Sequence, residues 1–279
     1  MVEQDNNYRS RWVEDTKRDR EVAYRILQKK SIEVGKDSKE LLKYLDMQVK
    51  FELYSPSNCL LLLAQMPEAT YCREAINWQK EGYKVRLREK SAVILEPSKP
   101  ILREDGSSHV YYNPKRVYDI SATNAPRKDS KPFPKEKDVL RALLRSSPIN
   151  IQAVDNLDTE DKCALYNENE HVLCVCRNKD TANTIHDIVY EISKYYMDIE
   201  AKVDRDINSF KSTCVTYMFC KKYGVDFPKE IFDRLENQLD GNDKVIRDRL
   251  LSMNDASNLI CNRVDGAIEK ERKSREQVR

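Results

Sequence analysis

The sequence at residues 181–197 reads Thr-Ala-Asn-Thr-Ile-His-Asp-Ile-Val-Tyr-Glu-Ile-Ser-Lys-Tyr-Tyr-Met. It begins like the zinc-binding helix pattern H-E-x-x-H, in which two histidines one helical turn apart hold the metal and the glutamate activates its water. Here His186 keeps the first position, whereas Asp187 replaces the glutamate and Tyr190 replaces the second histidine. The stretch therefore predicts a helix that keeps the layout of such a site without most of its metal chemistry.

The composition is typical of a helix-rich globular protein of one or two domains. The chain has 279 residues, of which 34% are charged, 40% are hydrophobic and only 6 are glycine. No stretch approaches the roughly 18 consecutive apolar residues of a membrane-spanning helix, so we expect no membrane contact. The polar, acidic start, Met-Val-Glu-Gln-Asp-Asn-Asn, is unlike a secretory signal and favours a cytoplasmic location.

The eight cysteines lie in apolar segments without paired spacing, which favours reduced core residues over a disulfide framework. Two of them, Cys174 and Cys176, form an H-x-x-C-x-C cluster with His171, and Cys163 is near in sequence. On a strand the two cysteines point the same way and could share a metal. The same alternation also describes the apolar side of a buried strand, which is the favoured interpretation.

Positive charge is concentrated in the middle of the N-terminal half. Residues 71–135 hold 14 Lys and Arg against 8 Asp and Glu, a net charge of +6, although the whole chain is only +2. This segment is where a polyanion would most plausibly bind.

The first third of the chain predicts helices. Residues 9–30 read as an exposed, partly amphipathic helix, and residues 38–53 carry a stronger apolar stripe. Ser55 followed by Pro56 is a helix-start signature, since serine can cap the free N–H groups and proline fits the first helical position. The apolar run at residues 59–64 should then form a short buried helix.

From Tyr83 the period changes to that of strands. Residues 83–88 alternate apolar and basic side chains, and residues 92–95 make a second strand. Residues 110–112 and 117–120 supply two more, separated by a turn at Asn113-Pro114. These elements predict an α+β fold, with N-terminal helices and a small antiparallel sheet.

The polar, proline-containing stretch at residues 126–137 is the best linker, which divides the chain into domains 1–125 and 138–279. In the second domain we expect helices at 138–146, around His186, at 210–223 and at 244–263, and strands at 149–154 and 172–176. The charge-dense tail after Glu269 is expected to fray.

The basic segment at residues 84–90 admits two interpretations. Alternate cations on an edge strand discourage aggregation and need no ligand. Aromatic side chains accompany them, however, and could stack on bases while the cations follow phosphates. Because the chain has no duplex-reading motif and no phosphate-binding glycine loop, single strands are preferred to duplex, and a nucleotide-dependent enzyme is disfavoured.

The order of these motifs resembles the ArdC-type antirestriction proteins, and among them the LtrC-like proteins of conjugative elements. Such proteins join an N-terminal single-stranded-DNA-binding domain to a C-terminal zincin-type metallopeptidase domain. The N-terminal resemblance runs from Tyr54-Ser55-Pro56-Ser57-Asn58 through Trp78-Gln79 to Val117-Tyr118-Asp119-Ile120-Ser121, and the lysine turn at residues 88–91 lacks the family's glycine.

The pattern and the resemblance together nominate a set of nucleic-acid-binding residues. They are Tyr54, Ser55, Asn58, Trp78, Lys84, Arg86, Arg88, Lys90, Tyr112 and Arg116. For Tyr54 and Asn58, an equally good interpretation is that they anchor the helix after residue 58.

The C-terminal resemblance covers residues 186–226 and is clearest at residues 215–226. It implies a zincin-like helical domain with a small sheet, in which Lys211 stands where active relatives place a metal-binding glutamate. A lysine there repels a divalent cation. With Asp187 and Tyr190, three of the four chemical positions depart from the family, so we expect no catalytic residue and no cofactor, with zinc as the disfavoured exception.

These observations predict a single-stranded-DNA-binding protein of a mobile element, acting in antirestriction or DNA protection, with an inactive metallopeptidase-like domain. One alternative is a metallopeptidase with atypical ligands. Another is an adaptor without nucleic-acid binding, which would hold a protein partner through the helix at 9–30 or the C-terminal domain.

Overall fold

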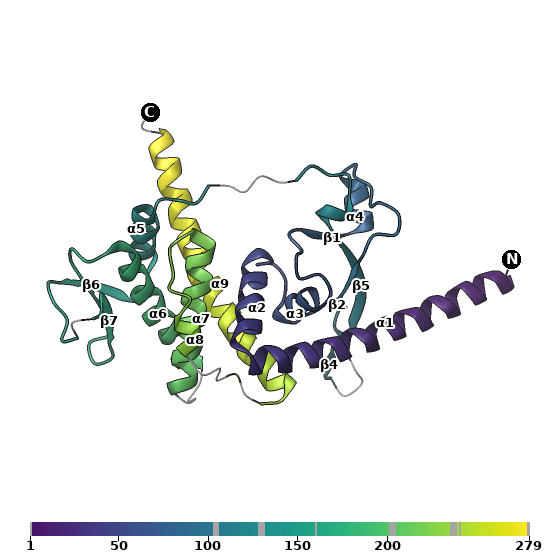
Figure 1. Ribbon diagram of the computed structural model, residues 1–279, viewed down its shortest axis with the longest axis horizontal. Helices are drawn as coiled ribbons and strands as arrows, with labels where there is room; N and C mark the ends of the chain where they lie inside the picture. The colour runs from purple at the N-terminus through teal and green to yellow at the C-terminus, as the bar shows by residue number, and fades with distance from the viewer. Residues whose placement is uncertain are drawn as a thin grey trace. The chain divides into compact units, whose positions relative to one another are not determined.

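The computed structural model describes residues 2–102, 106–127, 132–159, 161–200, 205–234, 239 and 241–277. The chain forms two compact units, each built of helices and small sheets, which confirms the α+β class (Figure 1). The N-terminal unit comprises Met1–Val34, Lys39–Asp129 and Gly241–Arg247; the C-terminal unit comprises Gly35–Ser38, Ser130–Asp240 and Asp248–Arg279. In the described part of the chain, no helix is long and apolar enough to cross a membrane.

Three helices open the N-terminal unit: α1 (Val2–Lys36), α2 (Ser38–Lys50) and α3 (Pro56–Gln65). The predicted helices are confirmed, and α1 is longer than expected. The start of α3 is as predicted, because the Ser55 hydroxyl accepts a hydrogen bond from the amide of Asn58 at 3.3 Å. Its apolar run is buried, with Leu60, Leu61 and Leu62 at the core.

A three-stranded antiparallel sheet follows, in the order β1 (Cys72–Glu74), β5 (Tyr112–Asp119) and β2 (Ala92–Pro97). Val117 of the central strand pairs with Glu74 on one side and with Ala92 on the other. The short helix α4 (Ala75–Lys80) lies between β1 and β2 in sequence, and the 3-10 turn η1 (Ile120–Ala122) follows β5. A separate ribbon pairs β3 (Ile101–Leu102) with β4 (Ser108–His109).

Two strand predictions in this unit were wrong. Residues 83–88 form a loop with one isolated bridge, Val85 to Thr123, because the alternation has no partner strand along its length and Arg88 turns into the left-handed region with φ 61°. Residues 112–119 form one continuous strand that passes through Asn113-Pro114 without a turn. Proline is tolerated there because β1 pairs only with residues 117–119 of β5, so Pro114 lies where the strand has a neighbour on one side and no partner needs its missing amide hydrogen on the other.

The C-terminal unit holds the sheet β6 (Asn150–Val154), β8 (Val172–Cys176) and β7 (Ala164–Asn167), in that order. Strand β6 runs parallel to β8, whereas β7 is antiparallel to it. Its helices are α5 (Glu136–Ser146), α6 (Thr181–Glu200), α7 (Arg205–Tyr223), α8 (Ile231–Arg234) and the part of α9 (Asp243–Gln277) from Asp248 onward. Helices α6 and α7 pack together, and each carries fully buried side chains, such as Ile188 on α6 and Phe219 on α7.

The end of α9 differs from the expected frayed tail, since the helix continues to Gln277. Its charges are arranged in favourable pairs four residues apart. Lys273 lies 2.7 Å from Glu269, and Arg275 lies 2.6 Å from Glu271. Such pairs support a helix by a few tenths of a kcal/mol each, and Arg141 of α5 adds a further contact to Glu271 at 3.0 Å.

Candidate nucleic-acid interface

Asp119 connects the end of the central strand to the start of β1. One carboxylate oxygen accepts hydrogen bonds from the amides of Thr70 at 2.6 Å and Tyr71 at 2.8 Å, and the other accepts from Ser121 at 2.9 Å. Burial by itself would raise the pKa of Asp119, but these hydrogen bonds outweigh it and hold the pKa below its ordinary value. The carboxylate is therefore ionised and serves to hold Tyr71 and η1 in place.

Trp78 of α4 is the centre of an aromatic cluster. Its side chain is only 1% exposed, and its indole N–H donates to the carbonyl of Tyr118 at 3.0 Å. Tyr71 and Tyr83 pack edgewise against it, with ring centroids 5.6 and 6.3 Å away. Because the indole is enclosed, the half-buried Tyr71 and Tyr83 are the rings of this cluster that reach the surface.

Arg73 adds a cation to this aromatic surface. Its guanidinium lies 4.9 Å from the centre of the Tyr71 ring and is paired with Glu81. Arg73 and Tyr71 were not among the predicted site residues. The signal in the sequence was the alternation Tyr71-Cys72-Arg73, which places the two side chains on one side of a strand.

The loop at residues 84–90 carries the predicted cations, but they do not behave alike. Arg86 donates to the carbonyls of Ser121 and Thr123 and pairs with Glu89 at 2.8 Å, so its guanidinium is committed to the fold. Lys84, Arg88 and Lys90 are exposed and form no ion pair with any described residue.

The backbone of this loop is fastened at its start. The amide of Arg86 donates to Ala122 at 2.9 Å, and the amide of Asn124 donates to Lys84 at 3.2 Å. The tip beyond these bonds presents Leu87, whose side chain is 94% exposed. The loop therefore has a fixed base and a tip that combines free cations with one apolar side chain.

Tyr54, Ser55 and Asn58 lie at the start of α3, where their polar atoms are engaged within the unit. The Tyr54 hydroxyl donates to the carbonyl of Cys72 at 3.1 Å. The Asn58 amide makes a two-way pair with the backbone of Leu95, donating at 3.0 Å and accepting at 2.9 Å. These contacts favour the anchoring interpretation that the sequence left open.

Arg116 is committed to an ion pair within the unit, and Tyr112 lies away from the basic loop. The Arg116 guanidinium makes a bidentate pair with Asp19 of α1, at 2.7 and 2.8 Å. Tyr112 pairs with Pro97 at the end of β2, whereas the basic loop enters β2 at Ala92. At about 3.3 Å per residue the two ends of that strand are roughly 17 Å apart. Of the predicted residues, Lys84, Arg88 and Lys90 thus share one exposed loop, which directly follows Tyr83 of the Trp78 cluster.

In the C-terminal unit, the ring of His186 makes contacts within the fold instead of presenting a nitrogen to a metal. Its Nε2 donates to the carbonyl of Asp226 at 2.6 Å, and its ring packs on Phe227 with centroids 5.3 Å apart. A carbonyl oxygen can only accept, so Nε2 carries a proton and cannot also bind a metal.

The other three positions of the motif are engaged separately. Asp187 accepts the amide of Cys163 at 2.6 Å. Tyr190 has the Lys162 ammonium 5.9 Å from its ring centre. Lys211 is only 7% exposed, and its ammonium donates to the Ser252 hydroxyl at 3.1 Å.

The donor set does not fit the zinc that the motif would hold. It offers a protonated imidazole nitrogen, a carboxylate bound to a backbone amide, a phenol and an ammonium group, where three neutral or anionic donors are needed. In the described part of the chain, no group of three or more His, Cys, Asp and Glu is placed to hold a metal. His171, from the alternative cluster, lies instead 3.1 Å from the Tyr166 hydroxyl.

Comparison with solved structures finds this fold in the antirestriction ArdC protein from R388 plasmid. The metal-free crystal structure matches with a TM-score of 0.53 at 16% identity, over 76% of this chain and 86% of that one. The Mn(II)-bound crystal structure matches with a TM-score of 0.56 at 14% identity, over 88% and 97%. No protein-family model and no curated protein matches the sequence. The chain therefore has an ArdC-type fold, as predicted.

Proposed function

We propose that this ArdC-type fold serves as a single-stranded-DNA-binding protein of a conjugative or other mobile element, which protects incoming DNA from host restriction. The observation that carries the proposal is the loop at residues 84–90. Its three cations without an ion pair to a described residue, Lys84, Arg88 and Lys90, follow directly on Tyr83, a half-buried ring of the Trp78 cluster. Cations that follow the phosphates and rings that stack on bases are the two components of sequence-tolerant single-strand binding.

The DNA-binding proposal is tested with the variant Lys84→Ala/Arg88→Ala/Lys90→Ala and a fluorescent oligothymidine. Each phosphate contact on a single strand contributes about 0.7 to the slope of log affinity against log salt, so removing three should make the slope shallower by about 2. Fluorescence anisotropy at several salt concentrations measures this slope.

A matched control removes three cations of the same unit that are already paired on helices: Arg18, Lys29 and Lys43. The control lowers the net charge equally, so it should leave the slope near that of the unmodified protein. Equal effects of the two triple variants, or a full chain that binds no oligonucleotide at low salt, would contradict the proposal.

We further propose that the C-terminal unit is a metallopeptidase-like fold without catalytic activity. The engaged His186, Asp187 and Lys211 side chains support this. Purified protein should carry no stoichiometric zinc or manganese in elemental analysis, whether or not His186 is replaced by Ala. Stoichiometric metal that is lost on His186→Ala, together with peptidase activity, would instead support the atypical enzyme.

The biological setting is tested by plasmid transfer into a restricting recipient. Expression of the protein in that recipient should raise the transfer frequency relative to the triple loop variant, with little change in a recipient that lacks restriction. A protein partner that is retained on the full chain while oligonucleotide binding is absent would favour the adaptor.

A further inference from the structure

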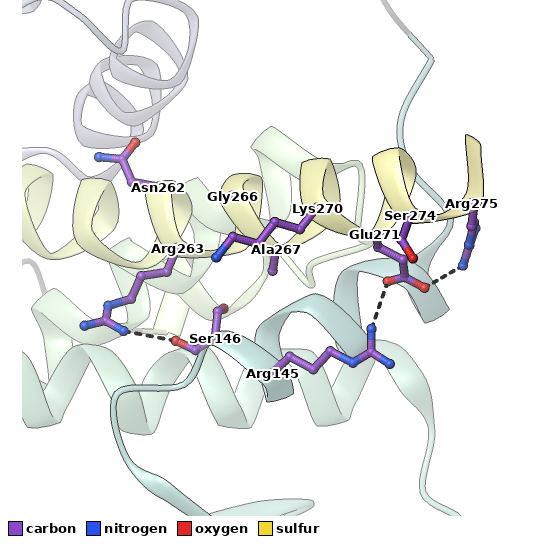
Figure 2. Close-up of a pocket in the computed structure, with 10 residues that line it drawn as sticks. All are labelled: Arg145, Ser146, Asn262, Arg263, Gly266, Ala267, Lys270, Glu271, Ser274 and Arg275. Atoms are coloured by element: carbon purple, nitrogen blue, oxygen red, sulfur yellow. Dashed lines mark hydrogen bonds and ion pairs between the residues drawn. The ribbon is translucent and has the colours of Figure 1, made fainter. Parts of the chain in front are cut away.

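A second cationic surface lies in the C-terminal unit, in a groove between the end of α5 and α9 (Figure 2). The groove has a volume of about 810 Å³. Residues about 120 positions apart in the sequence form its two sides, with Arg145 and Ser146 on α5 and Arg263 and Lys270 on α9. It belongs to neither the loop at residues 84–90 nor the positions around His186.

The groove carries a surplus of positive charge. Four cations line it, Arg145, Arg263, Lys270 and Arg275, against the single carboxylate of Glu271. Arg275 lies 2.6 Å and Arg145 3.6 Å from that carboxylate. Asp138, outside the lining, also pairs with Arg275, at 3.3 Å, but neither carboxylate forms an ion pair with Arg263 or Lys270, so the lining carries a net positive charge.

Two of the cations have no acidic partner among the residues that the structure describes. Arg263 donates to the carbonyl of Ser146, at 3.4 Å, and Lys270 forms no ion pair with any described residue. Figure 2 shows Lys270 between the Arg263–Ser146 contact and the Glu271 pairs. Both are therefore available to an anion that enters the groove.

Small and uncharged polar residues complete the lining of the groove. Gly266 and Ala267 form part of it, and a Cβ atom added at Gly266 would meet nothing within 4 Å. The remaining lining contributes hydroxyl and amide groups from Ser146, Asn262 and Ser274. An extended ligand can thus approach the α9 backbone and find hydrogen-bond donors there.

The lining favours a phosphate-bearing chain over a protein segment. Protein partners are usually anchored by aromatic or large apolar side chains in matching pockets, and no residue lining this groove is aromatic or larger than alanine among the apolar ones. Phosphodiesters need cations and hydrogen-bond donors, and arginine in particular suits phosphate oxygens.

We infer that the groove between α5 and α9 binds the phosphodiester backbone of single-stranded nucleic acid, as a second contact surface. The inference rests on the proposed function and extends it to the C-terminal unit. Because the lining offers no ring for stacking, this contact is independent of base identity and depends on salt.

The test compares two double variants of the full chain with fluorescent oligothymidine. Arg263→Ala/Lys270→Ala removes the two unpaired groove cations. Arg272→Ala/Lys273→Ala is the control, since these cations lie on the same helix outside the groove lining and pair with Glu276 and Glu269. The groove variant should bind about tenfold more weakly at low salt, with a log–log salt slope shallower by about 1.4, whereas the control should match the unmodified chain.

Lys270→Ala alone guards against a folding artefact, because that side chain forms no ion pair with a described residue; it should give about half of the slope change. Unmodified binding and slope in the groove variant would overturn the inference and leave the proposed function standing. Equal weakening by the control would also overturn it, as an effect of net charge. Binding of poly-glutamate is measured in parallel. If the groove variant loses poly-glutamate binding but keeps oligonucleotide binding, the groove would be a site for acidic protein segments and the inference would be overturned. A full chain that binds no oligonucleotide would overturn both proposals.

Discussion

At the residue scale, side chains that look like ligand-binding groups are often the ones that hold the fold. Trp78, Asn58 and Arg116 were each predicted to contact nucleic acid. In the structure, the polar group of each is hydrogen-bonded within its own unit. Among the described residues, the predicted cations without an ion pair are instead Lys84, Arg88 and Lys90 of the loop at residues 84–90. Withdrawing a hydrogen-bonded, buried group from its partner costs free energy, so the proposed binding role is assigned to groups without such a partner.

Asp119→Asn tests the most connected of these residues. The carboxylate accepts amide hydrogens on both oxygens, whereas an asparagine amide presents N–H to one of them. We expect the free energy of unfolding at pH 7 to fall by about 2 kcal/mol. Urea unfolding of the two proteins measures the difference.

The same substitution predicts a pH dependence. The pKa of Asp119 is lower in the folded chain than in the unfolded one, so its stabilisation is complete above the unfolded pKa of about 3.9 and is lost as the pH falls through the folded value. The difference in the free energy of unfolding between the unmodified protein and Asp119→Asn should therefore become smaller at acidic pH. A gap that stays constant from neutral pH to strongly acidic pH would show that the carboxylate's charge is not the cause.

At the scale of elements, α3 covers the edge of the sheet. Strand β2 is an outer strand in the order β1-β5-β2, so its outward backbone groups need partners. Asn58 pairs with Leu95 in both directions, and Gln65, two turns later on α3, does the same with Val93 at 2.9 and 3.0 Å. Two side-chain amides thus take the place of a neighbouring strand.

Asn58→Ala and Gln65→Ala should each destabilise the chain because each leaves a backbone N–H and a C=O of β2 without a partner. We expect about 1–3 kcal/mol for each change, measured by chemical unfolding. Ser57→Ala, in the first turn of the same helix, is the control and should cost under about 0.5 kcal/mol. If both amide variants were as stable as the control, solvent would be satisfying the edge of β2.

At the scale of the whole molecule, each unit carries, in its described part, a cationic surface whose charge is not fully paired. The two surfaces differ in chemistry, since the loop at residues 84–90 adjoins tyrosine rings and the groove of α5 and α9 has none. The first suits bases together with phosphates, and the second suits phosphates alone.

Combining the loop variant with the groove variant tests whether both surfaces act on one nucleic acid. The losses in salt slope should add, to about 3.5 for five cations at about 0.7 each. A combined slope no shallower than that of the loop variant alone would mean that the groove makes no contact with bound DNA. Anisotropy titrations of the four proteins against one oligothymidine provide the comparison.

The sequence by itself determined the elements whose signals are local. The Ser55 cap, the buried leucine run of α3, the strands β2 and β8 and the helix around His186 were all readable from neighbouring residues, because caps and periodicity act within a few positions. The departures from the zinc-binding pattern at Asp187 and Tyr190 were equally plain, whereas Lys211 was assigned through the family resemblance. The alternation at residues 83–88 misled, because a strand also needs a partner that its own residues do not reveal.

Tertiary structure alone decided which polar side chains form hydrogen bonds or ion pairs within the fold and which remain exposed to solvent. Arg86 and Lys84 look equivalent in sequence, but only Arg86 meets carbonyls 35 and 37 residues away. The groove needs Arg145 and Arg263, which are far apart until α5 and α9 pack. Such contacts depend on how buried faces bring distant segments together, and that information is distributed over the whole core of each unit.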